Sequence, residues 1–132
     1  MPDRRYFRDP THVHTDAYKR TSQLAQWNGE GVRNMSDDKV RYGKTSKFVW
    51  VRGTADTVVW PNRAEQWDVL NDDYPANLTV LPMAEAAWYV DDPFGLRTAQ
   101  EGGKNFFEEY PGNHLRFSTA ALEGWLDKYF LD

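Results

Sequence analysis

Apolar residues near the C-terminus recur with the spacing of one helix face. They lie three and four positions apart, the period that places side chains on the same side of an α-helix. The members of this set are Leu122, Trp125, Leu126, Tyr129 and Phe130. Just before them, Ser118 and Thr119 are residue types that cap helix N-termini. The pattern predicts an amphipathic terminal helix that packs on a sheet.

Two β-rich segments, residues 47–52 and 57–60, lie on either side of the short stretch 53–56. Their β-branched and aromatic residues, with a glycine between them, are typical of a β-hairpin. Apolar residues occupy both faces of the first segment, since Phe48 and Trp50 alternate with two valines. That pattern predicts a central strand that is covered on both sides.

The remaining pattern predicts shorter helices and one more strand. The expected helices cover residues 11–27, one turn from Ser36, residues 62–70 and residues 92–103, and the third strand covers residues 77–81. Together these elements predict an α+β fold: a small, mostly antiparallel sheet packed by N-terminal and C-terminal helices. We expect residues 1–10 to form an extended arm and residues 11–132 to form a single α+β domain, because a chain of this length can bury one core.

Composition narrows the chemistry of the protein. The absence of cysteine excludes disulfides, thiolate nucleophiles and cysteine-bound metals. Six Trp, seven Tyr and seven Phe, without any Ile, predict a largely aromatic core and rings to spare for a binding surface. No apolar stretch approaches the roughly 20 residues that span a membrane, and no signal segment is visible. We therefore expect a cytoplasmic protein without a membrane partner.

Charge is distributed unevenly along the chain. Residues 1–52 hold eleven Lys or Arg against six Asp or Glu, whereas residues 53–132 hold five against fourteen. A basic N-terminal part joined to an acidic body predicts a partner that recognises charge. The same asymmetry allows head-to-tail association of identical chains, so a homo-oligomer is a further expectation.

The segment from His12 to Asp16 contains the residue types of a metal site. Imidazole and carboxylate groups bind zinc or iron, and His12, His14 and Asp16 lie close together in sequence. A helical period separates them, however, because it places His12 beside Asp16 and turns His14 the other way. The third histidine, His114, can join them only through the fold.

No segment carries a complete catalytic motif. The four serine residues lie in no nucleophile-elbow pattern. Because a catalytic triad is assembled in space, this absence weakens the prediction of an enzyme without closing it. The sequence predicts neither a catalytic residue nor a bound metal or cofactor.

The leading hypothesis is a non-enzymatic protein-binding module of the inhibitor, immunity, adaptor or virion-assembly type. Its predicted partner-binding residues are Arg4, Tyr6, Phe7, Arg8, Lys39, Arg41 and Lys44. One alternative is a nucleic-acid-binding protein that uses the basic and aromatic stretch 33–52. The other alternative is a small metal-dependent hydrolase that uses His12, His14 and Asp16.

Overall fold

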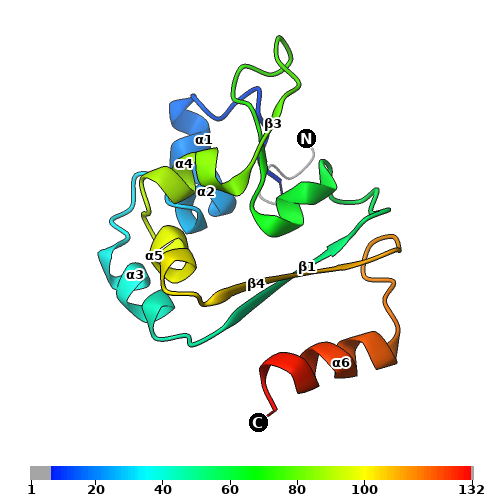
Figure 1. Cartoon of the computed structure of the whole chain (residues 1–132). Helices are drawn as coiled ribbons and strands as arrows, with labels where there is room; N and C mark the ends of the chain where they lie inside the picture. Colours follow the sequence, from blue (N-terminus) through cyan, green and yellow to red (C-terminus); the bar gives the residue numbers. More distant parts are fainter. Residues whose placement is uncertain (1–6, 132) are drawn as a thin grey trace.

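The longest strand ladder joins two segments that lie far apart in the sequence. In a computed structural model, which describes residues 7–131, strand β1 (Phe48–Gly53) pairs with strand β4 (Asn105–Tyr110). The two strands run parallel, side by side, near the middle of the molecule (Figure 1). The predicted first strand is confirmed, but its partner is not the segment that follows it.

The predicted hairpin is wrong because the loop after β1 turns instead of extending. The Asp56 carboxylate accepts hydrogen bonds from the backbone N–H groups of Val58 and Val59, at 2.7 and 3.0 Å. Such a bond between an aspartate and the backbone that follows it stabilises a turn. Residues 57–60 therefore form no strand, and Val58 and Trp60 are 70% and 65% exposed.

The fold is mixed α/β, so the predicted mostly antiparallel sheet is corrected. A second sheet, of strands β2 (Val69–Leu70) and β3 (Val80–Leu81), is antiparallel. The described residues also contain six α-helices and two short 3₁₀-helices. The α-helices are α1 (Asp16–Thr21), α2 (Gln23–Trp27), α3 (Ser36–Gly43), α4 (Ala87–Val90), α5 (Leu96–Glu101) and α6 (Thr119–Tyr129). The 3₁₀-helices are η1 (Asn62–Gln66) and η2 (Met83–Glu85).

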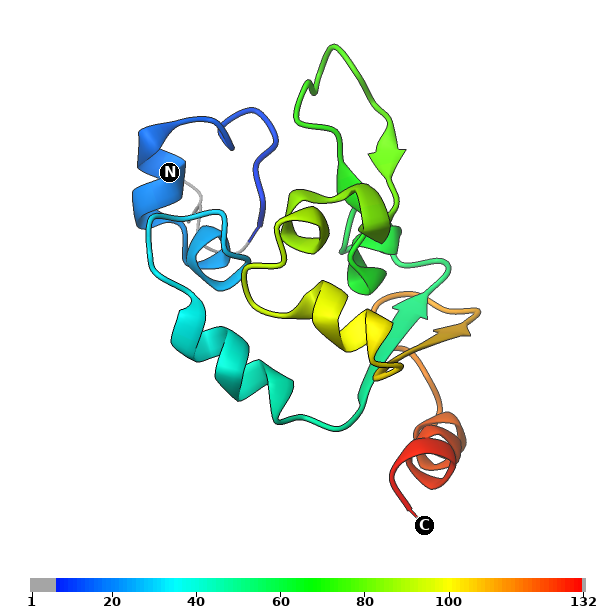
Figure 2. The same ribbon diagram turned by 60° about the vertical axis from the view of Figure 1, so that its left-hand side comes forward.

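The predicted N-terminal helix over residues 11–27 is broken into two at Ser22. The backbone N–H of Ser22 bonds to the Tyr18 carbonyl and ends α1. The Ser22 side chain then accepts a hydrogen bond from the backbone N–H of Ala25 and starts α2. The two helices enclose a small core of Val13, Tyr18 and Ala25. They lie on the side of the molecule away from α6 (Figure 2).

The main core is aromatic, as the composition predicts. Trp88, Phe94 and Leu96 are buried, and the Trp67 ring lies 5.3 Å from Phe94 and 6.1 Å from Trp88 between ring centroids. Tyr42 extends the cluster, since its ring contacts Phe94 edge-on at 5.2 Å. This core lies on one side of the parallel sheet and holds the connection between β1 and β4 in place.

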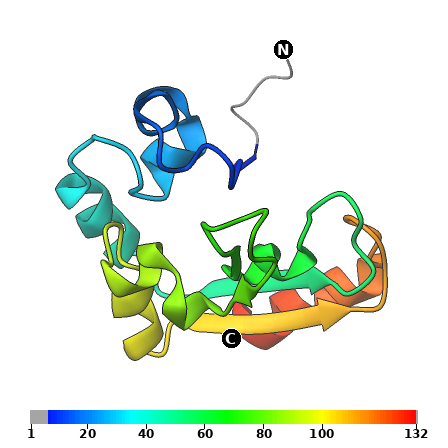
Figure 3. The ribbon, with the colours of Figure 1, turned by 90° about the horizontal axis from the view of Figure 1, so that it is seen from above.

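Helix α6 covers the opposite side of the parallel sheet, and its prediction is confirmed. Ser118 caps the helix by accepting a hydrogen bond from the Ala121 backbone N–H. The Tyr129 ring contacts Phe106 of β4 at 4.9 Å. Seen from above, α6 lies behind the two strands, whereas α3 and α5 lie toward the end at which the strands begin (Figure 3).

No helix among residues 7–131 is long and apolar enough to cross a membrane. The division into an arm and a single domain, and the cytoplasmic location, stay predictions. Arg4 and Tyr6 of the predicted arm lie outside the described residues.

Candidate active site

The carboxyl ends of β1 and β4 bring two loops together at one edge of the parallel sheet. The loop after β1 carries Asp56, and the loop after β4 carries His114, 58 positions later in the sequence. The His114 Nδ1 and Asp56 Oδ2 atoms are 2.7 Å apart. In parallel sheets, functional groups gather at this edge, because the strands release their loops there side by side.

The Asp56 side chain is fully buried and held by a specific set of donors. One carboxylate oxygen, Oδ1, accepts from the backbone N–H groups of Val58 and Val59, and the other accepts from His114. Burial alone would raise the pKa of this carboxyl, but the hydrogen bonds outweigh burial and lower the pKa to about 2. Asp56 is therefore ionised at neutral pH.

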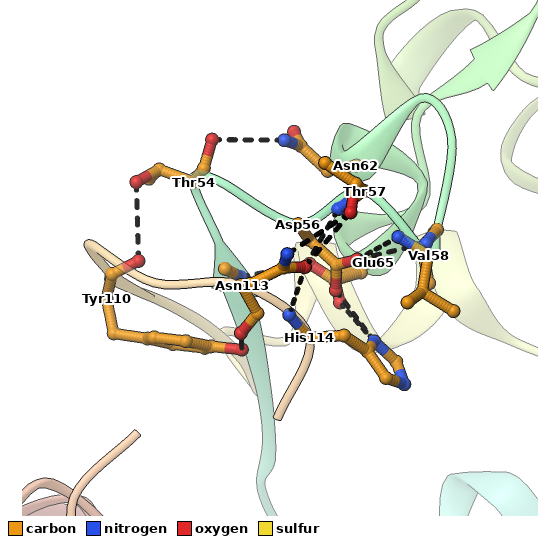
Figure 4. A network of polar contacts seen from close by, with 11 residues as sticks. Thr54, Asp56, Thr57, Val58, Asn62, Glu65, Tyr110, Asn113 and His114 are labelled. Carbon is orange, nitrogen blue, oxygen red and sulfur yellow. Dashed lines mark hydrogen bonds and ion pairs between the residues drawn. The ribbon is translucent and has the colours of Figure 1, made fainter. Parts of the chain in front are cut away.

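Asn113 fixes the His114 loop to the Asp56 loop. Its side-chain oxygen accepts from the backbone N–H groups of His114 and Thr57, at 2.7 and 3.0 Å. The Tyr110 hydroxyl donates to the Asn113 carbonyl at 2.9 Å. These bonds join the ends of the two strands, so the imidazole is positioned by the backbone of both loops (Figure 4).

Glu65 of η1 is a third titratable group at the same place. Its Oε2 accepts from the Gly53 backbone N–H at 3.0 Å, and its Oε1 lies 3.9 Å from His114 Nδ1. Burial, and then the hydrogen bond and negative charge of Asp56, raise the pKa of Glu65 above its ordinary value. In Figure 4 the three side chains meet, and the second nitrogen of the His114 ring points away from the carboxyl groups.

This arrangement fits a general base better than a metal centre. Among the described residues, Asp56, Glu65 and His114 form the one group whose ligand atoms, within 4.8 Å of each other, have the spacing of a metal site. The imidazole is already bonded to a carboxylate that two backbone N–H groups hold in place. A buried carboxylate bonded to Nδ1 leaves Nε2 free to accept a proton, as hydrolases of the serine type require.

The residues of the predicted metal site are not brought together. His12 bonds to Asp9 at 2.7 Å within a surface turn, whereas His14 and Asp16 are exposed. The Asp9 side chain keeps 21% of its surface exposed, and that of Asp56 keeps none. Two histidine–aspartate pairs of equal length therefore differ in burial.

The stretch 33–52, predicted to bind nucleic acid, contains α3 and most of β1. Its aromatic rings pack against one another within the fold. Phe48 stacks on Tyr42 at 4.3 Å and on Trp50 at 5.8 Å between centroids. The Trp50 indole N–H also donates to the Asn105 side chain. These rings stabilise the fold of β1.

The predicted partner-binding residues lie on different parts of the described chain. Phe7 is about half exposed and Lys44 is exposed. The Arg8 guanidinium, by contrast, is mostly buried within the chain. Lys39 forms an ion pair with the buried Asp92 at 2.9 Å, and Arg41 forms an exposed pair with Asp38. Their role in binding a partner stays a prediction.

Sequence reasoning missed Asp56 as a functional residue and considered His114 only as a third metal ligand. The available signal was an aspartate in the short loop that follows a predicted strand. The second half of the pair could not be recognised, because the pairing of β1 with β4 was not predicted.

Comparison with known proteins corrects the predicted function. A family model described as "Palmitoyl protein thioesterase" matches residues 3–114, which include both Asp56 and His114. The chain is also 30% identical over 127 residues to "Palmitoyl-protein thioesterase 1" of Caenorhabditis elegans. That alignment covers 96% of this chain and 41% of the nematode protein, so the chain spans less than half of its relative's length.

These matches overturn the prediction of a non-enzymatic binding module, and with it the expectation that the protein is not an enzyme. The matches agree better with the hydrolase alternative, which relied on His12, His14 and Asp16, than with the leading hypothesis. The chain belongs to the palmitoyl-protein thioesterase family, whose members are hydrolases.

Proposed function

We propose that this chain supplies the aspartate and histidine of a serine-type thioesterase site that releases a fatty acyl group from a protein thiol. The observation that carries the proposal is the 2.7 Å bond between buried Asp56 and His114. In the chain, the aspartate comes before the histidine, and each follows a parallel strand. The second and third members of an α/β-hydrolase triad have the same order. Accordingly, we infer that β1 and β4 belong to an α/β-hydrolase sheet.

In the proposed reaction, His114 first accepts a proton from the nucleophile and then donates it to the leaving group. Its Nδ1–H donates to Asp56, so Nε2 accepts the proton of a nucleophilic hydroxyl as that oxygen attacks the thioester carbonyl. The carbon–sulfur bond then breaks, and the imidazolium returns the proton to the leaving thiolate. Water hydrolyses the acyl-enzyme in the same way and releases the fatty acid. Asp56 keeps the ring oriented and stabilises the imidazolium.

The nucleophile is the missing member of this site. Within the described residues no serine is hydrogen-bonded to His114, and Ser22 and Ser118 have capping roles in helices. Because the chain spans 41% of its nematode relative, we propose that the nucleophile belongs to a part of the protein outside this sequence.

The proposal can be tested in a protein that includes the part expected to hold the nucleophile. A chimera in which this chain replaces the matching segment of the nematode relative is expected to hydrolyse a palmitoyl thioester substrate. Asp56→Asn and His114→Gln should each lower kcat/KM by about 10³-fold or more, because they remove the oriented base. Thiol release, measured with a chromogenic thiol reagent, follows the reaction.

His12→Gln in the same chimera is the matched control. It breaks a histidine–aspartate pair of the same 2.7 Å length on the surface, and activity should stay within about twofold of the parent. Full activity of the His114→Gln chimera would rule out the proposed role of His114.

A further inference from the structure

The Asp56–His114 pair contacts a second carboxyl group that the reaction described above does not use. Glu65 lies on η1, an element that packs against β1. Its Oε1 atom is 3.9 Å from His114 Nδ1, and carboxylate oxygens of Glu65 and Asp56 lie within 4.8 Å of each other. Two carboxyl groups this close cannot both ionise without a strong mutual repulsion, so the pair retains a proton that isolated carboxyls would have lost.

The number of donors around each carboxyl decides which of them holds that proton. Asp56 accepts from two backbone N–H groups and from the imidazole, and all three bonds stabilise its charged form. Glu65 accepts from the Gly53 backbone N–H. Asp56 is therefore the better anion, and Glu65 is the better acid.

We propose that Glu65 is a positioning residue, which keeps the shared proton, donates it to Asp56, and so leaves Asp56 as the single charged partner of His114. An ionised Glu65 would place a second negative charge 3.9 Å from Nδ1 and compete with Asp56 for the imidazole. The catalytic meaning of this role rests on the proposed function. The location of the proton does not.

The arginines near Glu65 form ion pairs with other carboxylates, so the location of the proton depends on Asp56, Glu65 and His114. Arg63, on the same 3₁₀-helix as Glu65, forms an ion pair with Asp68 at 2.6 Å. On the adjacent strands, Arg52 forms an ion pair with Glu109 at 2.7 Å. Within residues 7–131, Asp56 and His114 are the carboxylate and histidine groups that cluster with Glu65.

The location of the proton can be measured on the chain itself by ¹³C NMR titration of labelled Asp and Glu carboxyl carbons. We expect Glu65 to titrate above its ordinary value and Asp56 well below its own. In Asp56→Asn the titration of Glu65 should move back toward the ordinary value, although burial keeps it from returning fully. A Glu65 that titrates at or below the ordinary value, or that is unaffected by Asp56→Asn, would overturn the proposal.

The positioning role needs a readout that follows the hydrogen bond. The N–H proton between His114 and Asp56 is expected to give a downfield ¹H signal in the parent chain. Glu65→Gln retains a neutral donor and should preserve this signal, whereas Glu65→Ala removes the donor and should shift or abolish it. A folded Glu65→Ala chain with an unchanged signal would show that Glu65 does not position the pair.

Failure here can be distinguished from failure of the proposed function. If Glu65 does not titrate as expected but the chimera depends on Asp56 and His114 for activity, only the role of Glu65 is lost. If the NMR results hold and an active chimera is indifferent to His114→Gln, the proton is located correctly and the thioesterase role of His114 is wrong.

Discussion

Asp56 illustrates how burial turns a common pair of residues into a candidate for catalysis. Asp9 and His12 approach each other as closely as Asp56 and His114 do. Asp9 lies in a turn only three residues from its partner, whereas the side chain of Asp56 is withdrawn from water and held by the backbone. An immobile carboxylate can fix the orientation of an imidazole, and a solvated one cannot do so as strictly.

The lowered pKa of Asp56 predicts a loss of stability in acid. Because this pKa falls from 3.8 to about 2 on folding, the ionised carboxylate stabilises the protein above pH 4, and that contribution is lost as the pH falls from 4 to 2. The free energy of unfolding, from denaturant titrations followed by Trp fluorescence, should therefore fall less steeply over this interval in Asp56→Asn. The exposed Asp73→Asn serves as the control, and an Asp56→Asn slope equal to that of the parent would contradict the prediction.

At the scale of elements, the parallel pairing of β1 and β4 creates the site. Parallel strands need a long crossover connection, and here it contains η1, β2, β3, η2, α4 and α5. The Gln66 side chain of η1 donates to the Trp50 carbonyl on β1 and to the Glu108 carbonyl on β4, at 3.1 and 2.9 Å. The crossover thus stabilises the pairing of the two strands whose following loops carry Asp56 and His114.

Gly53 at the end of β1 allows a close approach between these two strand ends. A Cβ atom at this position would lie 2.7 Å from the Tyr110 hydroxyl oxygen and 2.8 Å from the Gly112 carbonyl oxygen. Gly53→Ala should therefore lower the free energy of unfolding by about 1–3 kcal/mol, because the backbone carbonyl must move. Unfolding in denaturant measures this loss.

Gly124→Ala is the matched control for this prediction. Gly124 lies inside α6 with nothing within 4 Å of the added carbon, so alanine should stabilise the protein by about 0.5–1 kcal/mol. If Gly53→Ala behaved like Gly124→Ala, the described approach of the two loops would be incorrect.

At the scale of the whole molecule, Arg8 joins the N-terminal helices to the main core. Its guanidinium bonds to Glu30 at 2.8 Å and to Asp72 at 2.7 Å, and it lies over the Trp88 ring. Glu30 also accepts from the Tyr18 hydroxyl, so the small N-terminal core is tied to this ion pair. The arginine predicted to meet a partner is engaged within its own chain.

Arg8→Met should lower the free energy of unfolding by about 1–3 kcal/mol, since it leaves Glu30 without its cation in a partly buried place. Arg41→Met removes an arginine whose side chain is 66% exposed, and it should change stability by less than about 0.5 kcal/mol. Thermal and denaturant unfolding of both variants test the prediction. Equal effects of the two substitutions would contradict it.

Local patterns in the sequence determined the elements whose signals are contained within a few residues. Helix α6 follows from its 3.6-residue period and Ser118, and strand β1 follows from its β-branched and aromatic residues. These features depend on side chains that meet within one element, so spacing alone reveals them.

Only the tertiary structure decided which strand pairs with β1, and therefore which residues meet. β4 was not predicted, and neither was its parallel pairing across the crossover. The pairing depends on the packing of distant aromatic residues and on the turn at Asp56, which directs the chain away from a hairpin. Asp56 and His114 meet because two parallel strands end at the same edge, and that long-range contact leaves no periodic trace in the sequence.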